Sequence, residues 1–268
     1  MKEKSEIIIG KKKISFLHLK KLIYNYSCLF QKNETEIVNL KNDSSIHFIA
    51  SLIGALQSKC TINIYDSEDV GEENLFNNFF ETNNELVSMK DDYKFDIEEP
   101  SFKLALKYRN KNMTYIDLKE ALIKSTKVFS KKDTVFVLDS KDLYSLCFGI
   151  LFPFYLNKSI LMNSNIEYTL KTFKPSILVG EKNSLRELYN TYFRKKMNFF
   201  NEWLYHSMRS WDVNCVDVYL NRNLFFKEIK CVKKLILNDY KDIQNFWNDL
   251  HSNGVDIYST DSFFKNLK

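Results

Sequence analysis

Short strand-like runs alternate with amphipathic stretches along the chain, and this alternation constrains the fold more than any other feature. A strand pattern at 35–40 is followed by a helix pattern at 44–58, with Ser44 or Ser45 as its cap, and by a second strand pattern at 60–66. A strand, a helix and a strand joined by short connections form a parallel crossover unit. We therefore expect an α/β fold with mainly parallel sheets flanked by helices.

The same alternation continues toward the C-terminus. The further expected strands are 102–108, 133–139, 158–163, 175–180, 232–239 and 254–260. The further expected helices are 14–30, 73–87, 114–129, 141–155, 166–173, 183–209 and 240–251. An acid-rich polar region at about 67–99 separates the two halves, so the sequence predicts two α/β lobes, residues 1–100 and 101–268. No internal repeat stands out at a fixed period.

Composition argues against several classes of protein. A chain of 268 residues that is 44% apolar can bury a substantial core, which excludes wholesale disorder. The net charge of +5 is modest and the basic runs are short and scattered among acids, so we expect no nucleic-acid partner. Five cysteines without a Cys-x-x-Cys pair are typical of reduced thiols. The four histidines lack neighbours at metal-ligand spacing, so no metal site is assigned to them.

Hydropathy bears on location. The most apolar window, residues 143–156, is 14 residues long and contains Pro153. A membrane span needs about 20 residues, so this window predicts a buried helix and no transmembrane segment. The apolar patch near the N-terminus has three residues, which is too short for a signal peptide. We expect a cytoplasmic protein, or one bound peripherally at a membrane surface.

Residues 101–120, "SFKLALKYRNKNMTYIDLKE", have the order strand, short polar loop and amphipathic helix that is found in many phosphate-binding loops. Such loops bind anions through successive backbone amides, which approach a phosphate only where side chains do not intervene. The stretch contains no glycine. Arg109 and Lys111 supply positive charge, which attracts a phosphate but cannot replace the amides. The stretch is therefore a nucleotide site, a degenerate one, or merely a connection.

Several stretches carry a resemblance to a known family. In chain order they are "KKISFLHLKKLIYNYSCLF", "EIVNLKNDSSIHFIASLIGALQSKCTINIYDS", "VFVLDSKDLYSLCFGILFPFYLNKSILM", "FKPSILVGEKNSLRELYN" and "FKEIKCVKKLILNDYKDIQNFWNDLHSNGVDIYSTDSFF". Their pattern and order resemble the N-terminal part of the large domain of the adenylate-forming (AMP-binding) superfamily, in particular the long-chain acyl-CoA synthetases. The resemblance spans nearly the whole chain, but no single motif of the family is intact.

The resemblance implies a two-step ligase, in which a carboxylate and ATP give an acyl-adenylate and pyrophosphate, and CoA then displaces AMP. ATP, Mg²⁺ and CoA are implied as cofactors by the resemblance alone. The positions that match the family's nucleotide-binding elements are Arg109, Lys111, Thr114, Tyr258, Ser259, Thr260 and Asp261. Tyr258 would stack near the adenine, Thr260 would contact the phosphate, and Asp261 would replace a glutamate that helps to hold Mg²⁺. No catalytic residue is assigned.

The departures from the family pattern predict a degenerate, truncated long-chain acyl-CoA synthetase-like protein without ligase activity of its own. The adenine segment at 235–242 has no glycine, and the pocket wall near Asp142–Tyr144 has no histidine. The chain ends at Lys268, before the family's ribose-binding aspartate and its small domain with a catalytic lysine. Two alternatives stay open: a fragment of an active AMP-forming acyl-CoA ligase completed by further sequence or a partner, and an α/β interaction module of unrelated role. A truncated sheet would expose an apolar face near the C-terminal strand unless a protein partner covers it.

Overall fold

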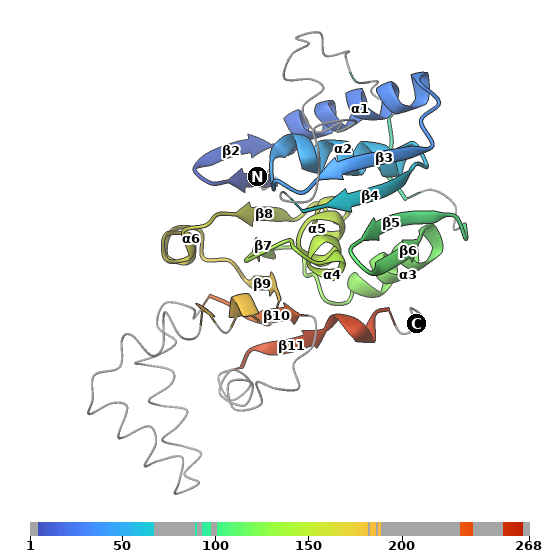
Figure 1. The fold of residues 1–268 in the computed structure, drawn as a ribbon. Helices are drawn as coiled ribbons and strands as arrows, with labels where there is room; N and C mark the ends of the chain where they lie inside the picture. The colour runs from blue at the N-terminus through green and yellow to red at the C-terminus, as the bar shows by residue number, and fades with distance from the viewer. Residues whose placement is uncertain are drawn as a thin grey trace, which may run out of the picture.

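The computed structural model describes residues 5–66, 89, 93–97, 101–181, 183–185, 187–188, 231–237 and 254–264, and shows two sheets with helices around them (Figure 1). In spatial order, the larger sheet contains β11 (Asp256–Ser259), β10 (Lys234–Leu237), β9 (Ile177–Gly180), β7 (Thr134–Val137), β8 (Ser159–Met162), β1 (Glu6–Ile9) and β2 (Lys12–Ser15). The smaller sheet contains β3 (Ile37–Lys41), β4 (Thr61–Tyr65), β5 (Leu104–Tyr108) and β6 (Lys111–Thr114).

Among the described strands, the antiparallel pairings are β1 with β2 and β5 with β6, and the others are parallel. The longer helices are α1 (Phe16–Lys32), α2 (Ile46–Gln57), α3 (Tyr115–Ser125) and α6 (Ile166–Phe173). These elements confirm the predicted α/β class with mainly parallel sheets. The expected helices at 73–87 and 240–251, and most of the one at 183–209, lie outside the described residues.

The two sheets are built by two units of the same topology, although no repeat stands out in the sequence. Each unit runs hairpin, helix, strand, helix, strand: first over 6–65, then over 104–162. The hairpin of each unit pairs with the last strand of the other, because β1 pairs with β8 and β5 pairs with β4. Each sheet therefore takes strands from both sides of residue 100, and the expected division into lobes 1–100 and 101–268 does not follow the sheets.

The two hairpins are the main difference from the expected elements. The expected helix at 14–30 begins at Phe16, because residues 12–15 form β2 and Ser15 caps the helix. The expected polar loop after 108 is a two-residue turn followed by β6. Both second strands are short and polar, "KKIS" and "KNMT", and they lie at sheet edges, so they lack the apolar alternation that marks a strand.

The core joins the two sheets. The larger sheet buries both faces: Val135 and Val137 contact the main core, while Phe136 between them packs in a second cluster on the opposite face. The main core also contains side chains of the smaller sheet and of α1 and α2. Because both faces of this parallel sheet are covered, its strands have continuous apolar sequences rather than alternating ones.

The expected buried helix at 141–155 is present as three joined segments. These are α4 (Leu143–Leu146), a π-helical turn (Cys147–Leu151) and α5 (Phe152–Tyr155). Pro153 has no N–H and crowds the carbonyl four residues before it. In the π-turn the Phe152 N–H donates to the carbonyl of Cys147, five residues back, and the helix passes through the proline before it ends at Tyr155. No helix in the described part of the chain is long and apolar enough to cross a membrane.

Candidate functional site

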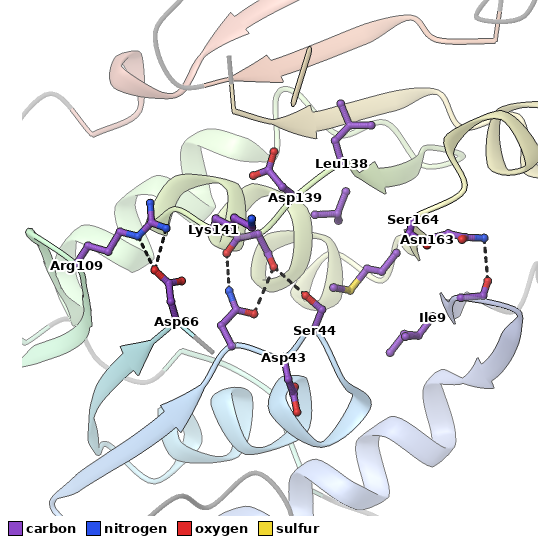
Figure 2. Close-up of a pocket in the computed structure, with 15 residues that line it drawn as sticks. Ile9, Asp43, Ser44, Asp66, Arg109, Leu138, Asp139, Lys141, Asn163 and Ser164 are labelled. Atoms are coloured by element: carbon purple, nitrogen blue, oxygen red, sulfur yellow. Dashed lines mark hydrogen bonds and ion pairs between the residues drawn. The ribbon is translucent and has the colours of Figure 1, made fainter. Parts of the chain in front are cut away.

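The carboxyl-terminal ends of strands from both sheets open onto one hollow of about 550 Å³ (Figure 2). Its lining comes from residues that directly follow or end β1, β3, β4, β7 and β8, together with the turn of the second hairpin. In open α/β sheets, ligands bind outside the carboxyl ends of the strands. The hollow is therefore the first candidate for a binding site in this part of the chain.

An ion pair closes one side of the hollow. The Nε and Nη2 atoms of Arg109 both lie 2.9 Å from Oδ2 of Asp66 (Figure 2). The Tyr108 hydroxyl donates to Asp66 Oδ1 at 2.7 Å. Burial opposes ionisation of this carboxyl, but the hydrogen bonds from Tyr108 and Arg109 lower the pKa of Asp66 below its usual value. Asp66 is therefore ionised at neutral pH, and the charge of Arg109 is compensated within the protein.

The opposite side of the hollow repeats this arrangement in the other unit. Asn163 follows β8 as Asp66 follows β4, and its side-chain amide donates to the carbonyl of Gly10 at 3.0 Å (Figure 2). Gly10 occupies the turn of the first hairpin, with φ at +60°, as Arg109 occupies the second turn with φ at +53°. In each unit, the side chain of the residue after the last strand thus bonds to the hairpin turn of the other unit.

The first group of predicted nucleotide-binding positions lies on the second hairpin. Arg109 is in the turn, Lys111 begins β6, and Thr114 ends it. The Thr114 hydroxyl accepts from the Asp117 N–H at 3.3 Å, and the Asp117 carboxylate accepts from the Thr114 N–H at 3.0 Å. This is a capping box, which satisfies backbone donors at the start of α3. Thr114 therefore has a structural role.

Replacing Thr114 by alanine is expected to lower the free energy of unfolding by about 1 kcal/mol, because the N-cap hydroxyl is lost. Denaturant unfolding of the purified chain measures this change. Thr114→Ser keeps the hydroxyl and should stay near the parent. Thr126→Ala is a matched control, because its exposed hydroxyl only donates to the Ile123 carbonyl near the end of α3. Equal stability of Thr114→Ala and the parent would contradict the capping role.

The second group of predicted positions lies at the end of the larger sheet. Tyr258 and Ser259 end β11, and Thr260 begins a short 3₁₀ turn (Thr260–Ser262). Thr260 is 1% exposed, and its hydroxyl oxygen is buried without a hydrogen-bond partner among the described residues. Tyr258 is half-buried and packs against the main core. The backbone of Asp261 lies in the 3₁₀ turn; its side chain lies outside what the structure describes.

Tyr144 links the two groups. The Lys111 Nζ lies 3.7 Å from the centroid of the Tyr144 ring, and the Phe264 ring stacks on Tyr144 with centroids 4.9 Å apart. The sequence places the family's pocket wall near Asp142–Tyr144, and the structure puts Tyr144 in contact with the second hairpin and with the segment after Thr260. Phe263 and Phe264 also pack against Phe148, which holds this segment to the buried helix.

Beside Tyr144, three acidic residues converge at the carboxyl ends of two neighbouring strands. Asp139 follows β7, Glu181 follows β9, and Asp142 caps α4. One carboxylate oxygen from each residue lies within 4.8 Å of the others. Burial, followed by the charges of Asp139 and Asp142, raises the pKa of Glu181 above its usual value. Asp139, Asp142 and Glu181 form the acidic cluster.

A scan against protein-family models found no match, and a search of curated proteins found none either. The NpsA N-terminal subdomain of Klebsiella oxytoca, in complex with 3-hydroxyanthranilyl-AMSN, matches 95% of this chain at a TM-score of 0.61 and 7% identity. The anthranilate CoA ligase AuaEII, in complex with anthranoyl-AMP, matches 95% at a TM-score of 0.63 and 11% identity. The fatty acyl-adenylate ligase from L. pneumophila, in complex with acyl adenylate and pyrophosphate, matches 94% at a TM-score of 0.57 and 11% identity.

The chain has the fold of the N-terminal subdomains of adenylate-forming enzymes. The matches cover 67%, 56% and 50% of the three neighbours, so the chain spans only part of their length. The comparison confirms the coarser part of the resemblance, and the long-chain type stays a prediction. At 7–11% identity the likeness concerns the fold, so the activity has to be argued from the residues of this chain.

Sequence reasoning missed Asp66, Asp139 and Glu181, although all three carry a signal, which is clearest for the first two. Both directly follow short apolar strand patterns, "CTINIYD" and "DTVFVLD", at the ends where side chains of parallel strands gather. Glu181 follows "PSILVG" in the same way.

The predicted exposed apolar face near the C-terminal strand stays a prediction. Ile257 and Tyr258 of β11 are half-buried, and residues 238–253 before this strand lie outside the described part.

Proposed function

We propose that this chain is a degenerate adenylate-forming domain of the long-chain acyl-CoA synthetase type. It acts as an interaction or regulatory module, and on its own it does not activate carboxylic acids with ATP. The observation that carries the proposal is the second hairpin: its turn is short, lacks glycine, and holds an arginine whose charge is compensated by Asp66. We propose a cytoplasmic location, or a peripheral one at a membrane surface.

Phosphate binding needs backbone amides that point at the anion, or cations that are available to it. The Arg109–Asn110 turn connects two paired strands, and Tyr108 and Lys111 on either side are already in register. Arg109 is bound by Asp66, and the Thr114 hydroxyl is engaged in the capping box. An adenylating enzyme must neutralise the charge that develops on the phosphates, and this hairpin offers little to do so.

A second function is favoured by one specific observation. The buried Thr260 hydroxyl has no partner among the described residues, and it matches the threonine that contacts phosphate in the family resemblance. An unsatisfied buried hydroxyl is costly and is often explained by a ligand or a water. The second candidate is therefore a ligase fragment that becomes active when further sequence or a partner completes the site.

The test is pyrophosphate exchange into ATP by the purified full chain, with fatty acids of several lengths and with aromatic acids. The expected result is no acid-dependent exchange above a chain-free control, while an active adenylate-forming enzyme in the same buffer gives a clear signal. Exchange that depends on a fatty acid would refute the proposal. Exchange that appears only with an added partner would favour the second candidate.

A paired variant tests the physical reason. Asp66→Asn frees Arg109 and should give the chain an ATP-dependent rise in melting temperature, because binding to the native state stabilises it. Asp43→Asn is the matched control, since Asp43 lines the same hollow and makes no contact with Arg109. We expect a shift in Asp66→Asn and none in the control, with no exchange activity in either. Equal responses of the two variants would show that the ion pair is not the obstacle.

A further inference from the structure

The two aspartates of the acidic cluster use their carboxylates in the same unusual way. Asp142 Oδ1 accepts the N–H groups of Tyr144 and Ser145 at 2.8 and 3.2 Å, as the cap of α4. Asp139 Oδ2 accepts the Glu181 N–H at 3.1 Å and the Ser184 hydroxyl. In each residue one oxygen is thus fixed by protein donors.

The other oxygen of each aspartate is left without a partner. Asp142 is 7% exposed, and its Oδ2 is buried and has no hydrogen-bond partner among the described residues; Asp139 Oδ1 is in the same state. A buried carboxylate oxygen without a donor is costly, and buried charges are normally paired or coordinate a metal. The structural hydrogen bonds hold both carboxylates in place, so their free oxygens cannot turn to solvent without breaking the cap or the Asp139–Glu181 bond.

The cluster has the ligand chemistry of a hard cation. Its three carboxylates come from the ends of β7 and β9, which pair directly, and from the start of α4. Ca²⁺ binds oxygen at about 2.3–2.6 Å, so two of its ligands are up to about 5 Å apart, whereas Mg²⁺ at about 2.1 Å requires about 4.2 Å or less. One carboxylate oxygen from each residue of the cluster lies within 4.8 Å of the other two. Every oxygen–oxygen separation up to 4.8 Å fits within the coordination shell of a Ca²⁺ ion.

We propose that Asp139, Asp142 and Glu181 bind one Ca²⁺ ion. Three carboxylate ligands leave coordination positions of this ion for water or for an anionic ligand, because Ca²⁺ takes six to eight oxygens. Two cations of the second hairpin act on Glu181: Arg109 is bound by Asp66, and the Lys111 ammonium lies over the Tyr144 ring. The inference is independent of the proposed function, since it concerns the chain without ATP or any carboxylic acid.

Two measurements on the full chain test the site. The first is equilibrium dialysis with Ca²⁺ after treatment with a chelator, which should give one ion bound per chain. The second is the melting temperature as Ca²⁺ is added. At a free concentration of about 100 times Kd we expect a rise of about 5 °C. Mg²⁺ at the same concentration should give a smaller rise.

Variants separate the site from general charge effects. Asp142→Asn keeps the cap, because asparagine caps as well as aspartate, but removes the charge. Glu181→Gln removes the second charge and keeps the backbone N–H bonded to Asp139. Both should lose the bound ion and the Ca²⁺-dependent rise, and in chelator both should melt above the parent, because repulsion within the cluster is relieved. The matched controls, Asp43→Asn in the hollow and exposed Glu120→Gln on α3, should behave as the parent.

Each outcome decides the proposal. One bound Ca²⁺ that is lost in Asp142→Asn and Glu181→Gln, and kept in both controls, supports it. No bound ion in the parent, or a rise of equal size in all four variants, overturns it. A rise with Mg²⁺ that equals or exceeds the rise with Ca²⁺ overturns the assignment of calcium. Should Asp142→Asn fail to fold, Glu181→Gln carries the test alone, because this change keeps the Glu181 backbone N–H that bonds Asp139.

Discussion

Replacing Lys234 by methionine is expected to lower the free energy of unfolding by about 3–5 kcal/mol, because the change leaves a buried carboxylate without its cation. Lys234 Nζ lies 2.9 Å from Asp133 Oδ2, and the two side chains are 17% and 6% exposed. Asp133 directly precedes β7, and Lys234 is the first residue of β10. The pair therefore bridges two strands of the larger sheet that are separated by β9.

The surroundings of this ion pair increase the expected effect. Asp133 Oδ2 also accepts the Ser130 N–H at 2.7 Å, and Asp133 Oδ1 accepts the Ser176 hydroxyl at 2.9 Å. Lys234 additionally donates to the Val128 carbonyl at 2.6 Å. Without the lysine, Asp133 Oδ2 and the Val128 carbonyl each lose a donor at a position that is largely buried. The cost of burying the Asp133 carboxylate is then no longer compensated.

Denaturant unfolding of Lys234→Met, Asp133→Asn and the double variant measures the coupling. The double variant should be more stable than Lys234→Met alone, because the buried carboxylate that lost its salt-bridge partner is no longer charged. Lys124→Met is the matched control: its partner Glu120 is an exposed neighbour on α3, so the loss should stay below about 1 kcal/mol. A loss below about 1 kcal/mol for Lys234→Met as well would contradict the argument.

The ion pair also gives stability a pH dependence of known sign. Burial alone would raise the pKa of Asp133, but the bonds from Lys234, Ser130 and Ser176 lower it below its usual value. A carboxyl with a lowered folded-state pKa stabilises the fold above its unfolded pKa of about 3.9, and the contribution is lost as the pH falls through the folded value. Between pH 7 and pH 3 the parent should lose more stability than Asp133→Asn.

Replacing Gly54 by alanine is expected to destabilise the chain by about 2–3 kcal/mol, although alanine favours helices. A methyl group at Gly54 would lie 2.7 Å from Tyr26 Cβ, 3.0 Å from the Ile23 carbonyl oxygen and 3.1 Å from the Ser27 nitrogen. Two of these atoms belong to the backbone of α1, so no side-chain rotation relieves the contact. The gain in helix propensity, about 1 kcal/mol, offsets only part of the cost. Figure 1 shows α1 and α2 side by side.

Thermal or denaturant unfolding of Gly54→Ala tests this close contact. Gly10→Ala is the matched control, because nothing lies within 4 Å of a methyl group there and only the positive φ of +60° makes the change unfavourable. The control should lose about 1 kcal/mol, less than Gly54→Ala. If Gly54→Ala is as stable as the parent, α1 and α2 can separate without loss of packing, and the predicted role of Gly54 is wrong.

Much of the fold could be predicted because it follows from local patterns. The predicted helix at 166–173 is confirmed. The sequence predicted Ser44 or Ser45 as the cap of α2, and the structure shows that Ser45 accepts the Phe48 N–H. The parallel crossovers follow from apolar runs of strand length between helices. The hairpins could not be predicted in this way, since each consists of short strands joined by a two-residue turn and one strand of each is polar.

The candidate site, too, could be predicted from the sequence only in part. The sequence determined which residues carry charge near the ends of strands, and that the stretch at 101–120 has no glycine with which to build an amide cradle. Only the tertiary structure decided that Arg109 is compensated by Asp66, 43 positions away, and that Glu181 lies beside Asp139, 42 positions away. The reason is physical: local periodicity reports which side of a strand is buried, whereas the pairing of β4 with β5 and of β7 with β9 determines which strand ends meet.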